Sequence, residues 1–145
     1  MVSTIVEFFM APDDASAALA LRTGPGRAES SLSFGNFDAE EAVVEWECLL
    51  VGGGFEELVE AGEPCVVAGR DDAGCVVLAV SPRLSAALAD AERSRLREVA
   101  VAWAARRAED GEVIGTEIAE VILGDLAALA GDARRQGQEV YCWVA

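Results

Sequence analysis

Hydrophobic residues follow two different spacings along this chain, and the changes between them predict the order of helices and strands. In residues 38–51 the apolar side chains recur every three or four residues, which is the period of a helix with one buried face. The same period, with one interruption, runs through residues 82–103 and returns in residues 116–136. Runs rich in β-branched and aromatic side chains predict four strands, at residues 3–9, 65–68, 75–80 and 140–144.

Residues that favour helix ends support these boundaries. Asp38 stands at the N-cap position of the first long helix. Ser81 and Pro82 supply an N-cap and a first-turn proline for the next one, which we expect to break near Asp90. Gly137 follows the last helix at the position where a left-handed backbone is common.

Three shorter segments complete the predicted fold. Residues 15–21 and 55–60 are predicted to be short helices, and residues 22–36, rich in glycine and serine, to be a loop. Residues 70–74 connect two strands as a hairpin. No repeat or linker divides the chain, so residues 1–145 are predicted to form a single α+β domain. Its small, mostly antiparallel sheet would include both terminal strands and be covered by four to five helices.

The charge of the chain removes several classes of function. Its 26 acidic residues stand against 11 arginines, with no lysine and no histidine, which gives a formal net charge of −15. Without histidine, nucleophilic systems that use an imidazole base and imidazole metal ligands are excluded. A surface this acidic repels phosphate, so neither nucleic acid nor an anionic membrane is expected as a partner. A basic protein is electrostatically compatible with it.

The remaining composition predicts a cytoplasmic protein without a cofactor. No stretch approaches the roughly 20 apolar residues of a membrane span, and no positively charged segment precedes the apolar N-terminus. The four cysteines have no C-x-x-C spacing and lie among apolar residues, as small buried side chains do in a reducing compartment. We therefore predict no metal site and no catalytic residue.

Three segments of the chain resemble the YfbM-like bacterial proteins, a family of unknown function. Residues 45–52 read EWECLLVG, similar to the family's helix that closes in Leu-Leu-Thr-Gly. Residues 77–84, VLAVSPRL, match its step from strand to helix, and residues 123–129, LGDLAAL, match its last helix. The resemblance implies the α+β architecture but no activity, since the family has none assigned.

An acidic face on the first long helix suggests a binding function. Glu41 and Glu45 lie on one stripe of the predicted helix, with Glu47 beside it. Phe34, in the preceding loop, would add an aromatic anchor. Our leading hypothesis is a non-catalytic acidic protein, inhibitor-like or immunity-like, that uses these residues to bind a basic partner.

The alternative is a small-molecule-binding protein or enzyme with a pocket around Asp125. This residue lies three positions after Ile122, so helical geometry places its carboxylate in line with an apolar stripe. Trp103, Tyr141 and Trp143 would line the same pocket, between the sheet and the last helix. Self-association as a homodimer is a third hypothesis.

Overall fold

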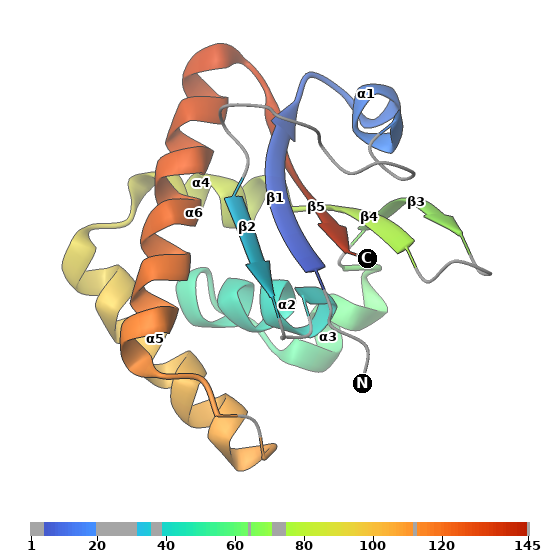
Figure 1. Ribbon diagram of the computed structural model, residues 1–145. Helices are drawn as coiled ribbons and strands as arrows, with labels where there is room; N and C mark the ends of the chain where they lie inside the picture. Colours follow the sequence, from blue (N-terminus) through green and yellow to red (C-terminus); the bar gives the residue numbers. More distant parts are fainter. Residues whose placement is uncertain are drawn as a thin grey trace.

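A computed structural model describes residues 5–19, 32–35, 39–63, 65–70, 75–111 and 113–144 of the chain (Figure 1). The elements, in order, are β1 Ile5–Ala11, α1 Asp14–Ala18, β2 Leu32–Gly35, α2 Ala39–Leu50, α3 Phe55–Glu60, β3 Cys65–Arg70, β4 Cys75–Ala79, α4 Pro82–Asp90, α5 Arg93–Glu109, α6 Thr116–Gln136 and β5 Glu139–Val144.

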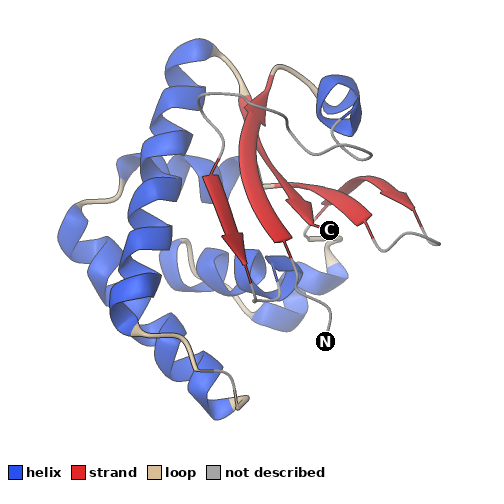
Figure 2. Cartoon of the chain, viewed as in Figure 1, coloured by secondary structure: helices blue, strands red, loops and turns tan. Residues whose placement is uncertain are grey.

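The strands form one five-stranded sheet in the order β2-β1-β5-β4-β3, with every neighbouring pair antiparallel (Figure 2). The first and last strands lie side by side at its centre, where Phe8 pairs with Cys142 and Phe9 with Tyr141. The predicted α+β class is therefore confirmed, as is the prediction that both terminal strands share one sheet.

The two faces of the sheet are covered very differently. Val6 and Phe8 of β1 point toward the main core, which α2, α4, α5 and α6 complete. Phe9 and Tyr141 point to the opposite face, where a smaller cluster includes Ala17 of α1. This alternation along β1 is the period-two pattern of a strand buried on both faces.

Aromatic side chains connect the sheet to two helices. Trp46 of α2 lies between Phe8 of β1, at a ring-centroid distance of 6.0 Å, and Trp103 of α5, at 5.0 Å with an edge-to-face geometry. Such pairs add about 0.5–1.5 kcal/mol each beyond the apolar area they bury. The contacts fix α2 between β1 and α5, and this placement decides where the acidic residues of α2 point.

The predicted helix ends are confirmed where the structure describes them. The Ser81 hydroxyl caps α4 by accepting a hydrogen bond from the Leu84 amide at 3.1 Å, and Gly137 ends α6 with a left-handed φ of 66°. The helix predicted to break near Asp90 is two helices, α4 and α5. The Asp38 cap lies outside the described residues.

The prediction of a continuous loop over residues 22–36 was wrong at its end. Residues 32–35 form β2, which pairs with β1 so that Phe34 lies opposite Val6. Pairing with a neighbour 24 or more positions away in sequence stabilises this strand, and the local glycine and serine content does not reveal such a partner.

Candidate functional site

The acidic residues of α2 do not form the exposed face predicted from the sequence. Glu45 and Glu47 are only 2% and 3% exposed, and Glu41 is partly buried. Arginines on α4 and α5 approach these carboxylates and provide the counter-charges that burial requires. The prediction that Glu45 and Glu47 lie on a docking surface is therefore corrected: both belong to the interior.

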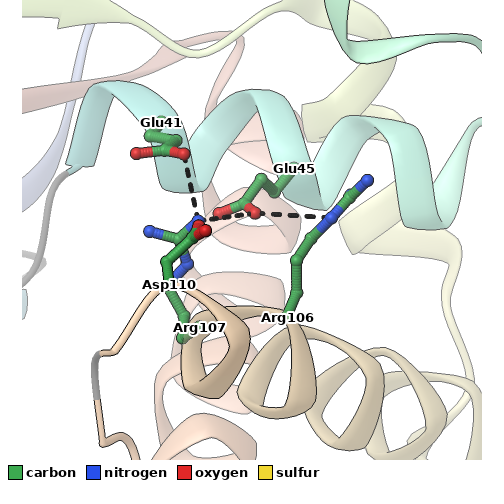
Figure 3. Close-up of polar contacts among 5 residues, drawn as sticks. All are labelled: Glu41, Glu45, Arg106, Arg107 and Asp110. Atoms are coloured by element: carbon green, nitrogen blue, oxygen red, sulfur yellow. Dashed lines mark hydrogen bonds and ion pairs between the residues drawn. The ribbon is translucent and has the colours of Figure 1, made fainter.

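The centre of this buried cluster is Arg107 of α5, itself 3% exposed (Figure 3). Its Nη2 atom donates to the carboxylates of Glu41 at 3.0 Å, Glu45 at 2.9 Å and Asp110 at 2.7 Å. The Arg106 Nε lies 3.6 Å from the same Glu45 oxygen that Arg107 contacts. Glu45 thus lies between two guanidinium groups, and the cluster joins α2 to the C-terminal end of α5.

Burial and the neighbouring charges shift the pKa values of Glu45 and Arg107 in opposite directions. Burial raises the pKa of Glu45, and the neighbouring Arg107 only partly offsets this. For Arg107, burial acts to lower the pKa, but hydrogen bonds and attraction from Glu41 and Glu45 outweigh it and raise the pKa above its ordinary value. Arg107 therefore stays charged, and the cluster is a structural connection between helices.

Glu47 forms a second buried connection, to α4. One of its carboxylate oxygens accepts a hydrogen bond from the Ser81 hydroxyl, and the Arg83 Nη2 lies 3.3 Å from the other. Because Ser81 also caps α4, a single hydroxyl serves both the helix end and the buried carboxylate. Glu47 is held in place by the start of α4 and is not presented to solvent.

A small cavity borders Glu47, Glu63 and Ser81. Its space of about 10 Å³ is close to that needed by one water molecule. Burial, and then the negative charge of Glu47, raise the pKa of Glu63. Ligand pockets for small organic molecules are usually some thirty times larger, so this cavity is a hydration site at most.

The residues of the alternative pocket are not brought together. Asp125 is exposed on α6, and Trp103 is fully buried in the main core. Tyr141 and Trp143 belong to the cluster on the opposite face of the sheet. There the Tyr141 hydroxyl donates to Asp14 at 2.7 Å, and burial together with that carboxylate raises the pKa of Tyr141.

The error over Asp125 has a simple geometric origin. Asp125 lies three positions after the buried Ile122, but it also lies four positions after Val121, which is 57% exposed. The buried face of α6 instead runs through Ile122, Leu126 and Leu129. Asp125 lies beside this face, on the exposed side of the helix that it shares with Val121.

The predicted aromatic anchor, Phe34, lies in β2 rather than in a loop. Its backbone pairs with β1, and its side chain is outside the described part of the structure.

Sequence reasoning overlooked the acidic side chains that do reach solvent. Glu56, Glu57 and Glu60 of α3 are all exposed, and they form no ion pair with any residue in the described ranges. The chain has no basic residue between Arg27 and Arg70, an interval that contains both α2 and α3. The three glutamates therefore have no basic neighbour close in sequence.

The four cysteines are free thiols, of which Cys142 is completely buried on the central strand β5. Burial raises the pKa of the Cys142 thiol. Within the described ranges, no three or more Cys, Asp or Glu side chains gather in a geometry that would hold a metal ion.

None of the helices in the described part of the chain is both long enough and apolar enough to cross a bilayer. Comparison with protein-family models, with curated proteins and with solved structures gives no match. The function of the chain is therefore inferred from its own residues.

Proposed function

We propose that this chain is a non-catalytic acidic protein that binds a basic protein partner, as inhibitor and immunity-type proteins do. The observation that carries the proposal is the exposed acidic surface of α3, where Glu56, Glu57 and Glu60 have no ion-pair partner among the described residues. Complementary charge at such a surface accelerates association and selects against acidic partners.

The way arginines are used in the molecule supports this proposal. Most arginines of the described ranges lie within 4 Å of a carboxylate and so neutralise this protein's own acidic groups. They are Arg83, Arg95, Arg97, Arg106, Arg107, Arg134 and Arg135. The negative charge of α3 is left to act on other molecules, over a distance of about 10 Å at 0.1 M salt.

We also propose that the protein is cytoplasmic and belongs with the YfbM-like bacterial proteins. Four free thiols support a reducing compartment. The family assignment is supported by the segments in α2, around Ser81 and in α6 that resemble it. Self-association is less favoured as the main function, because two copies would each bring a formal net charge of −15 to the interface.

Changing the charge of α3 tests the proposal. The triple variant Glu56→Gln, Glu57→Gln, Glu60→Gln removes three charges from α3. A matched control, Glu92→Gln, Glu109→Gln, Glu117→Gln, removes three exposed charges from the two ends of α5 and the start of α6. Both variants and the unmodified protein would be immobilised and incubated with lysate of the source organism, and the bound proteins identified by mass spectrometry.

We expect one basic protein to bind the unmodified chain and the control at about 0.05 M salt, to bind the α3 variant at least about tenfold more weakly, and to dissociate near 0.5 M salt. Association rates would then be measured with that purified partner. A partner that is itself acidic, or one that binds both triple variants equally, would overturn the proposal.

A further inference from the structure

Strand β3 lies at the edge of the sheet, and among the described residues only one of its sides is paired. It forms backbone hydrogen bonds with β4 only, and no other described segment pairs with it. Figure 1 shows β3 extending away from the helical layer, whereas the opposite edge strand, β2, lies beside α6. A free edge of this kind presents a row of backbone donors and acceptors to an incoming strand.

Apart from its last residue, Arg70, strand β3 carries no charged side chain, and its edge is uncrowded at Val66 and Gly69. Val66 is 56% exposed, although it pairs with Leu78, which is buried beneath the helices. The helical layer therefore stops short of β3. Gly69 lies on the same face, and an added Cβ there would meet only Val66 and Val76, at 3.8 and 3.9 Å. A neighbouring strand would find no bulky or charged side chain in its way at these positions.

An irregularity in β3 limits the kind of strand that fits. The register with β4 shifts between Val66 and Ala68, and Val67 is the extra residue. Bulges of this type twist an edge and discourage long, flat pairing between identical chains. The regular part of the edge, Ala68–Arg70, suits a short extended segment better than a second copy of the same sheet.

The charge around β3 indicates what that segment carries. Glu63 lies two residues before the strand, and α3, with its exposed glutamates, ends three residues before Glu63. A segment bearing lysine or arginine would therefore meet opposite charge at one end of β3. A second copy of this acidic chain would meet like charge.

From the unpaired edge, its exposed apolar positions and the adjacent acidic helix, we infer that β3 accepts an extended basic segment of the partner as a sixth strand of the sheet. This inference rests on the proposed function and specifies how the partner is recognised. Main-chain hydrogen bonds would provide the affinity, and the glutamates of α3 the preference for basic sequence.

A synthetic hexapeptide of alternating lysine and valine is the probe, added to the full-length, isotope-labelled protein. We expect the amide resonances of residues 65–70 to shift and their hydrogen exchange to slow. The same peptide with alternate amides N-methylated keeps its charge but loses its strand hydrogen bonds. It should bind at least about tenfold more weakly, the factor that corresponds to about 1.4 kcal/mol.

Two single substitutions provide a matched pair. Val66→Lys places a positive charge on the edge strand, and Val113→Lys places one at a valine that is 96% exposed before α6. We expect the first to weaken peptide binding by about tenfold and the second to change it by less than about threefold, because only the first opposes the basic peptide at the edge.

The outcomes separate this inference from the proposed function. Shifts confined to α3, or equal binding of the N-methylated peptide, would overturn strand addition while leaving an acidic docking surface in place. If the peptide caused no shift anywhere and the α3 variant kept its cellular partner, both would be overturned. Equal effects of Val66→Lys and Val113→Lys would also contradict the role of β3.

Discussion

Helices α2 and α3 are both rich in glutamate, but the glutamates of α3 are exposed whereas two of those in α2 are buried. In α2, Glu45 and Glu47 are buried and contacted by arginines from α4 and α5. In α3, the exposed glutamates have no such partner among the described residues. The difference lies in which other helices pack nearby, since neither segment contains a basic residue of its own.

This contrast separates two uses of acidic residues in one molecule. The buried carboxylates of α2 hold helices together, because an ion pair removed from water is sensitive to the loss of either member. The exposed carboxylates of α3 contribute little to stability and remain available for long-range attraction. The net charge of −15 is therefore less informative about binding than the location of the carboxylates that have no ion-pair partner among the described residues.

The strongest test of this contrast removes the central cation. Arg107→Met would leave Glu45 buried without its closest counter-charge, and we expect unfolding free energy to fall by about 3–5 kcal/mol. Chemical denaturation measures it. The α3 triple variant should change stability by less than about 0.5 kcal/mol per site. Comparable losses in the two proteins would show that the charges of α2 and α3 are not used differently.

Ser81→Ala tests the second buried connection, with a smaller expected effect. The substitution removes the α4 cap, which contributes about 1 kcal/mol, and leaves Glu47 without a hydroxyl donor, which costs about 1–3 kcal/mol more. Thr116→Ala, which removes an exposed hydroxyl at the start of α6, is the control and should change stability by less than about 0.5 kcal/mol. If the two alanine variants melted alike, the Ser81 hydroxyl would have no special role in holding Glu47.

The architecture was largely predictable because local patterns and local chemistry agree in most elements. The spacing of apolar residues located the three long helical regions, and Ser81 and Gly137 marked ends that the structure confirms. The exception was β2, four residues long, which exists because β1 is available beside it. Short edge strands depend on a distant partner, and sequence spacing does not contain that information.

The candidate site was much less predictable, and the reason is physical. Periodicity places Glu45 and Glu47 on particular sides of a helix, but their burial depends on whether arginines from segments more than 30 residues away reach them. The same limitation affected Asp125, whose exposure depends on the width of the buried face of α6. The absence of basic residues between Arg27 and Arg70 does not separate α3 from α2, since both helices lie in that interval.

The pH dependence of stability offers the finest test of how Glu45 differs from an exposed ion pair. Burial raises the folded-state pKa of Glu45, so between that value and the unfolded value of about 4.3 the folded state binds the proton more tightly. Folding then gains stability as pH falls through this window. Asp90 behaves oppositely: its exposed pair with Arg134 lowers its pKa, so its contribution is present above about pH 3.9 and is lost as pH falls further.

Subtracting matched variants isolates these two contributions from the titration of all other carboxylates. Denaturation of the unmodified protein, Glu45→Gln and Asp90→Asn would be followed between about pH 3 and 7. The stability of the unmodified protein relative to Glu45→Gln should increase as pH decreases, and relative to Asp90→Asn it should decrease. If both differences had the same sign, the attraction of Arg107 and Arg106 would outweigh burial at Glu45. The cluster in α2 would then follow the same electrostatics as a surface ion pair.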